Sequence, residues 1–142
     1  MAEVTIAPFV DTNVVVYALD ASDAAKQVRA QRLLDERPRP RTSPQVLREL
    51  YSVSVRKLGM SPDDAHATVE ALSPTVAVVE DVGLVLAAIA SVRRWQISIW
   101  DALIVEAARA AGCARLLSED LQAGMDFDGV VVENPFASAG DA

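Results

Sequence analysis

Acidic side chains stand at four separate places in the sequence where, if brought together, they could hold a divalent cation. Asp11 follows a short apolar run, Asp120 follows another, and Glu49 and Asp101 fall in stretches with helical spacing. Carboxylates that share one site raise one another's pKa unless a cation neutralises them. Mg²⁺ and Mn²⁺ prefer carboxylate oxygens. Such an ion lowers the pKa of its bound water, so the set suits hydrolysis of a phosphodiester bond.

Each acid also has a purely structural interpretation. Asp11 could cap a helix, Asp120 could cap a turn, and Asp101 lies three residues after Ser98, in a capping-box position. Glu49 could lie on a solvated helix face. Taken singly, a structural role is favoured for Asp101 and Asp120 and is even for Asp11, so the hypothesis depends on the whole set. A usual zinc site is excluded because the chain has one histidine and one cysteine.

The composition indicates one compact domain without a membrane segment. The chain has 142 residues, of which 51 % are hydrophobic, and its longest apolar run (82–90) is too short to span a bilayer. The start of the chain lacks the pattern of a signal peptide, and a single cysteine, Cys113, suits a reducing cytoplasm. A net charge of −7 argues against a basic nucleic-acid surface, unless some of the acids bind cations.

Short apolar runs alternate with longer helical segments, which predicts a parallel sheet flanked by helices. Ligands of such folds bind beyond the carboxyl ends of the strands, where Asp11 and Asp120 are expected. This topology allows the four acids to meet but does not force them to. Strands are expected at residues 6–10, 41–43, 75–79, 115–117 and 129–132, and helices at about 21–36, 44–58, 62–73, 82–93 and 99–111.

The acids are embedded in longer motifs: FVDTN at 9–13, SPQVLREL at 43–50, SIWDALI at 98–104 and LLSEDL at 116–121, with NPF at 134–136. In this order and spacing the motifs resemble those of PIN-domain ribonucleases, and among them the VapC-type toxins of prokaryotic toxin–antitoxin pairs. The third motif is the most specific. The likeness extends across nearly the whole chain.

The resemblance implies a single PIN domain at residues 1–136, followed by a disordered tail at 137–142. Its fold would be a three-layer α/β/α sandwich around a mostly parallel sheet of five strands. The activity implied is endonucleolytic cleavage of RNA that depends on Mg²⁺ or Mn²⁺. The partners implied are an RNA substrate, a small cognate antitoxin and a second copy of the chain, with no membrane.

Carried over by position, the resemblance makes Asp11, Glu49, Asp101 and Asp120 the catalytic, metal-binding acids. Asn13 and Ser118 match positions that usually brace the site by hydrogen bonds. Three further acids leave the ligand set open. Glu119 could compete with Asp120, and Asp126 and Asp128 are possible additions, although acids in a glycine-containing loop are more often turn residues.

Two other functions compete with this hypothesis. A phosphatase of the haloacid-dehalogenase kind also begins with an aspartate after its first strand, but it needs Asp-x-Asp and a later lysine. Here Asn13 replaces the second aspartate, and the only lysines are Lys26 and Lys57. A PIN-like scaffold that binds RNA or protein without cutting is the non-enzymatic alternative. Trp95 and Trp100 could stack on bases, although packing is the commoner role of a tryptophan near a helix start.

Overall fold

The computed structural model describes residues 6–137, and helices make up most of that range. The structure has three short strands: one is the first element of the described chain, and the other two are its last elements. In chain order the elements are β1 (Phe9–Val10), α1 (Thr12–Leu19), α2 (Ala24–Leu34), α3 (Pro44–Arg56), α4 (Pro62–Leu72), the 3₁₀ helix η1 (Ser73–Thr75), α5 (Val82–Trp95), α6 (Ile99–Ala110), β2 (Arg115–Leu117) and β3 (Val131–Glu133).

The sheet is parallel, with the strand order β1-β2-β3 and Phe9 paired to Leu116. It confirms the α/β class, but the described residues contain three strands instead of the expected five. The expected second and third strands reduce to single bridges, from Arg41 to Phe9 and from Thr42 to Val76. Residue 44 already begins α3, which ends the first of these segments, and η1 takes up the start of the second.

Two strand boundaries also differ from the expectation. The first strand begins at Phe9 rather than at residue 6, directly after Pro8, which has no N–H to donate to a ladder. The last strand begins at Val131 because Gly129 lies in a turn with a φ of 101°. The expected tail at 137–142 lies outside the described residues, except for the exposed Ala137.

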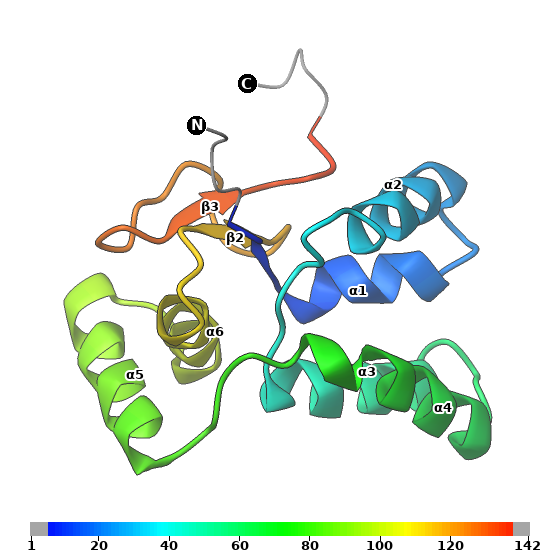
Figure 1. Cartoon of the computed structure of the whole chain (residues 1–142), viewed down its shortest axis with the longest axis horizontal. Helices are drawn as coiled ribbons and strands as arrows, with labels where there is room; N and C mark the ends of the chain where they lie inside the picture. The colour runs from blue at the N-terminus through cyan, green and yellow to red at the C-terminus, as the bar shows by residue number, and fades with distance from the viewer. Residues whose placement is uncertain (1–5, 138–142) are drawn as a thin grey trace.

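The strands lie between two groups of helices, as the three-layer prediction requires (Figure 1). Helices α5 and α6 pack together on one side, and α1 to α4 lie on the other. Strand residues Phe9, Val10 and Leu116 are fully buried in the core between them. Within residues 6–137 no single helix is long and apolar enough to cross a bilayer. Helices α5 and α6 taken together would be long and apolar enough, but the chain bends by 116° between them.

Helix α1 is the element that the sequence did not predict. Residues 14–16 are three consecutive valines, which favour a strand by intrinsic propensity. Burial outweighs that preference, because Val14 and Val15 are both packed into the core. Asp11 begins the helix, since its side chain accepts a hydrogen bond from the Thr12 N–H. The helix expected at about 21–36 is correspondingly shorter, at Ala24–Leu34.

The serine-based helix starts agree with the sequence. Ser43, Ser61 and Ser98 each accept a hydrogen bond from the backbone N–H three residues further on. Pro44 and Pro62 occupy the first helical turn, where a missing N–H costs nothing. The cap at Ser98 places Asp101 in the first turn of α6.

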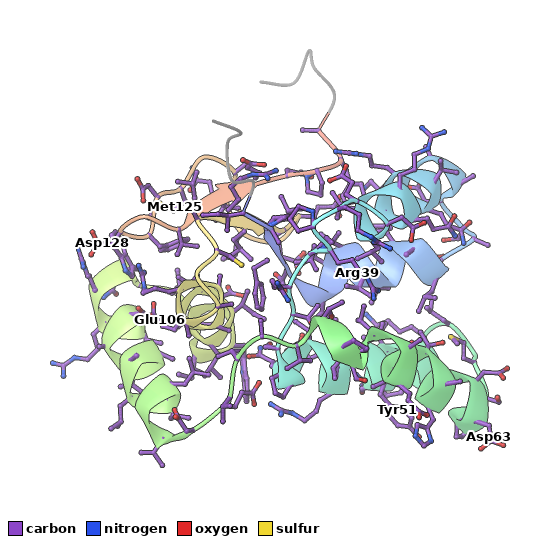
Figure 2. All side chains as sticks on the ribbon, in the orientation of Figure 1. Arg39, Tyr51, Asp63, Glu106, Met125 and Asp128 are labelled. Carbon is purple, nitrogen blue, oxygen red and sulfur yellow. The ribbon has the colours of Figure 1, made fainter. Side chains whose placement is uncertain are left out.

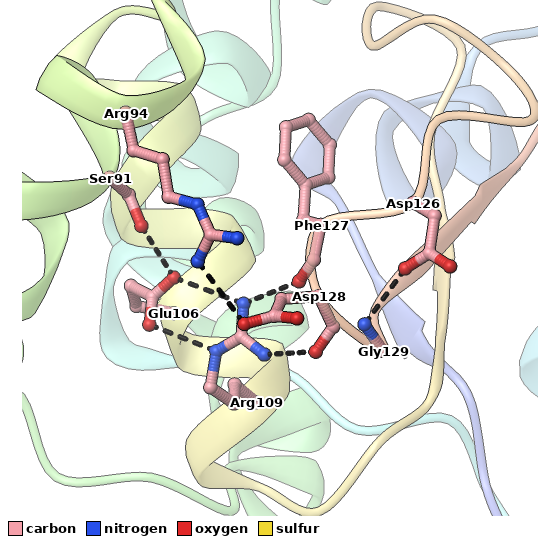
Figure 3. A network of polar contacts seen from close by, with 8 residues as sticks. All are labelled: Ser91, Arg94, Glu106, Arg109, Asp126, Phe127, Asp128 and Gly129. Carbon is pink, nitrogen blue, oxygen red and sulfur yellow. Dashed lines mark hydrogen bonds and ion pairs between the residues drawn. The ribbon is translucent and has the colours of Figure 1, made fainter.

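A buried polar network ties the loop between β2 and β3 to the two helices on its side. Glu106 of α6 is buried and points into the molecule, in contrast to the exposed Tyr51 at its outer edge (Figure 2). The Glu106 carboxylate accepts hydrogen bonds from Ser91 Oγ at 2.8 Å and Arg109 Nε at 3.0 Å. Arg109 also donates to the carbonyls of Phe127 at 2.6 Å and Asp128 at 2.8 Å (Figure 3).

We expect Arg109→Met to lower the free energy of unfolding by about 1–3 kcal/mol, because it removes the cation paired with a buried carboxylate and the donor to two carbonyls. The matched control is Arg115→Met, which removes an exposed ion pair with Glu133 and should cost less than about 1 kcal/mol. Urea unfolding of both variants measures the difference. Equal losses would contradict a structural role for the network.

Candidate active site

Asp11 lies at the carboxyl end of β1, and only 6 % of it is exposed. Its carboxylate accepts hydrogen bonds from Thr12 N–H at 2.8 Å, Asn13 Nδ2 at 3.1 Å and Ser118 Oγ at 2.9 Å. Ser118 reaches the Asp11 carboxylate because β2 pairs with β1 and ends at Leu117, so Ser118 directly follows the strand beside Asp11. Donors from two neighbouring strand ends therefore fix one buried carboxylate.

Asn13 and Ser118 also hold the turn that carries the fourth acid. The Asn13 side-chain oxygen accepts a hydrogen bond from Glu119 N–H at 3.0 Å. Ser118 Oγ accepts from the N–H groups of Asp120 and Leu121, each at 3.2 Å. The two residues that the resemblance assigned to bracing thus link α1, Asp11 and the turn after β2. Asp120 itself is exposed beside them.

Glu49 is held by two side chains that the sequence analysis did not identify. Thr12 Oγ1 donates to its Oε2 and Gln45 Nε2 donates to its Oε1, both at 2.8 Å. The same Gln45 nitrogen donates to the Trp100 carbonyl at 3.2 Å, which joins α3 to the start of α6. Gln45 stands four residues before Glu49 on one helix face, a spacing that could have drawn attention to it. No comparable signal marked Thr12.

Asp101 lies in the first turn of α6, where its N–H donates to Ser98 Oγ at 3.0 Å. Its side chain is half-buried. Its neighbour Trp100 is 65 % exposed, so packing does not account for that tryptophan. Trp95 does pack, edge-to-face on Phe127 at a ring separation of 5.5 Å.

The charges of Glu49 and Asp120 act on both Asp11 and Asp101. Burial, supported by the charges of Glu49 and Asp120, raises the pKa of Asp11 to about 6. Burial is also the main cause that raises the pKa of Asp101, and the charges of Asp120 and Glu49 add to it. No three acids, histidines or cysteines within residues 6–137 approach closely enough to form a ready-made ligand group.

The donor chemistry fits a hard divalent cation. All four acids offer oxygen ligands, and hydrogen bonds already orient Asp11 and Glu49. A cation between them would offset both the burial of Asp11 and the mutual repulsion. The residues present are therefore compatible with Mg²⁺ or Mn²⁺.

Glu119, the acid that left the fourth ligand open, is engaged elsewhere. Its carboxylate pairs with Lys26 Nζ at 2.6 Å and accepts a hydrogen bond from Tyr17 OH at 2.7 Å. Lys26 is the main cause that lowers the pKa of Glu119. Among residues 6–137, the Asp120 carboxylate has no ion pair or hydrogen-bond donor of this kind.

The two loop acids also have structural partners. Asp126 accepts a hydrogen bond from the Gly129 N–H at 2.8 Å, as expected of a turn residue. Asp128 pairs with Arg94 at 3.2 Å (Figure 3). In the part of the chain that the structure describes, neither side chain forms a hydrogen bond or ion pair with the four motif acids.

Comparison with known proteins agrees with the geometry. Residues 9–124 match the PIN domain family. Mycobacterium tuberculosis VapC20, described as a toxin that cleaves the sarcin–ricin loop, is 27 % identical, with a TM-score of 0.64 over 80 % of this chain and 92 % of that one. A comparison with curated proteins gave no match.

Two further structures share the fold at lower identity. VapBC from Salmonella typhimurium, bound to DNA, is 18 % identical, with a TM-score of 0.63 over 92 % of this chain and 99 % of that one. VapBC2 from Rickettsia felis, bound to a promoter fragment, is 17 % identical, with a TM-score of 0.59 over 91 % of this chain and 98 % of that one. The family match over residues 9–124, most of the chain, shows that this chain belongs to the PIN domain family.

Proposed function

We propose that this PIN domain is an endoribonuclease that depends on Mg²⁺ or Mn²⁺. The observation that carries the proposal is the placement of the four motif acids. They come from the end of β1, from α3, from α6 and from the turn after β2, and the charges of Glu49 and Asp120 raise the pKa of both Asp11 and Asp101. Asp11, Glu49, Asp101 and Asp120 are the proposed metal ligands.

Each residue around the site has a defined task in this proposal. Ser118 and Asn13 orient Asp11, and Thr12 and Gln45 orient Glu49, so these carboxylates are held before any ion arrives. When bound, the ion supplies a nucleophile at neutral pH and offsets the charge of the phosphate. The fixed hydrogen bonds reduce the reorganisation needed as charge develops during cleavage.

The biological role that we propose is that of a toxin in a toxin–antitoxin pair. Two of the similar structures are VapBC assemblies, and VapC20 is described as a toxin that cleaves the sarcin–ricin loop. We extend to this chain a small cognate antitoxin, a homodimeric state and RNA as substrate. A reducing cytoplasm suits the free, buried Cys113.

The competing functions make different demands on the site. A haloacid-dehalogenase-like phosphatase needs a second aspartate where this chain has Asn13, and Asn13 instead donates to Asp11. The family match also assigns the chain to the PIN domain family rather than to these phosphatases. A scaffold that binds without cutting would not need a buried carboxylate with a raised pKa, and activity is the property that separates it from a nuclease.

We expect Asp101→Asn to abolish cleavage of a sarcin–ricin-loop oligoribonucleotide or of total RNA in Mn²⁺. Loss of a residue that hydrogen-bonds a metal ligand typically lowers activity by about 10- to 100-fold, so loss of a ligand itself should lower activity by more than about 100-fold. Gel-resolved cleavage with and without chelator is the measurement, and Glu70→Gln, an exposed acid on α4, is the control. The same pair of variants can be compared for growth arrest on expression.

Cleavage by the wild type that survives chelation, or full activity in folded Asp101→Asn, would contradict the metal mechanism. A wild type that binds these RNAs and cuts none would favour the scaffold.

Gln45→Met should raise the Mn²⁺ concentration needed for half-maximal activity by about 10- to 100-fold, because Glu49 loses a donor that orients it. Activity at saturating Mn²⁺ should recover much of the loss. Metal titration of the cleavage rate is the measurement. A reduced maximal rate with an unchanged metal requirement would instead indicate general damage to the fold.

The raised pKa of Asp11 predicts a pH dependence of the metal-free protein. Between 3.8 and about 6 the folded state binds more protons than the unfolded chain, so the free energy of unfolding falls as the pH rises. The shift corresponds to about 3 kcal/mol. From about pH 4 to pH 7, wild type should therefore lose stability relative to Asp11→Asn in denaturation with chelator present. Parallel stability profiles of the two proteins would contradict the burial of a titrating Asp11.

A further inference from the structure

A cleft of about 570 Å³ opens from the acids and runs between α1 and α3. Figure 1 shows these two helices beginning near the centre of the molecule and extending away from the strands on the same side. Glu49 and Val53 of α3 and Lys57, the residue that ends it, line the cleft at a spacing of four residues. Such a spacing places all three on one helix face. Val16 and Tyr17 are part of the facing wall on α1.

The chemistry of the cleft changes along its length. Along α3, the carboxylate of Glu49 comes first, the apolar Val53 lies one turn further and Lys57 follows another turn on, at the end of the helix; Asp120 and Val16 also line the cleft. At 1.5 Å per residue, the eight residues from 49 to 57 extend about 12 Å along the helix axis. A volume of this size is typical of small-molecule sites.

Lys57 is the basic side chain of this cleft that no acid neutralises. Within residues 6–137 it forms no ion pair, whereas Lys26 nearby is paired with Glu119. Asp20, at the same outer part of the lining, accepts hydrogen bonds from Ser22 N–H and Oγ at 2.9 and 2.6 Å. The cleft therefore presents one unpaired cation, in a protein whose net charge is −7.

We propose that this cleft binds the stretch of RNA next to the scissile phosphate, with Lys57 contacting a neighbouring backbone phosphate. This inference rests on the proposed nuclease function and adds to it a direction for the substrate strand. Phosphate contacts supply most of the sequence-independent affinity for nucleic acids, and an acidic protein has few places to make them. The apolar section between Val16 and Val53 suits the face of a base, which is uncharged.

Lys57→Ala tests the proposal because KM and kcat separate an effect on RNA binding from an effect on the cleavage step. With a sarcin–ricin-loop oligoribonucleotide that the wild type cleaves, we expect KM to rise about tenfold and kcat to stay nearly constant. The slope of log(kcat/KM) against log salt should become shallower by about 0.7, the value of one released counterion on a single strand. Lys57→Arg should restore most of the loss.

Arg56→Ala is the matched control, because Arg56 precedes Lys57 on α3, is exposed and does not line the cleft. It removes the same charge and should leave KM and the salt slope unchanged. If Lys57→Ala behaves like Arg56→Ala, the proposal is overturned while the nuclease function stands. Equal rises in KM for both variants would also overturn it, since they would indicate net charge rather than a subsite.

Direct binding separates this proposal from the activity. Fluorescence anisotropy with the same oligoribonucleotide compares Asp101→Asn with Asp101→Asn/Lys57→Ala, neither of which needs to cut. A weaker complex in the double variant supports the subsite even if the wild type proves inactive. Equal affinity of the two proteins overturns it.

Discussion

The arrangement of the whole site depends on one buried carboxylate, that of Asp11. Parallel pairing of β1 with β2 brings Ser118 to it from the next strand end, and α1 begins at it. Burial of a charge is unfavourable unless donors or a cation compensate, and the Ser118, Asn13 and Thr12 donors compensate only in part. Its pKa of about 6 expresses the remaining cost. A cation at this position would relieve it, so the same feature that strains the metal-free fold favours metal binding.

The remaining acids are positioned by separate local devices that meet at this point. A serine cap sets the start of α6 and with it Asp101. Gln45 links the carboxylate of Glu49 to the carbonyl of Trp100, so α3 and α6 share one hydrogen-bonded contact beside the acids.

The sequence predicted those parts of the fold and site that depend on local chemistry. The caps at Ser43 and Ser98 and the strand at Arg115–Leu117 follow from nearest neighbours along the chain, and the structure has them. Helix α1 was missed because its valines favour a strand locally and become helical only through burial. The sheet was overestimated because single bridges at Thr42 and Arg41 look like strands in a sequence.

Side-chain partners distant in sequence were beyond prediction. Lys26 pairs with Glu119 rather than with Asp120, and no local pattern in the sequence reveals that partner. The most direct test of the account is a calorimetric titration of Mn²⁺ into the wild type and into single acid-to-amide variants. The account predicts that changes at Asp11, Glu49, Asp101 and Asp120 each weaken binding, while Glu119→Gln leaves it near the wild-type affinity. Undiminished binding in any of those four variants, or no binding by the wild type, would contradict a shared metal site.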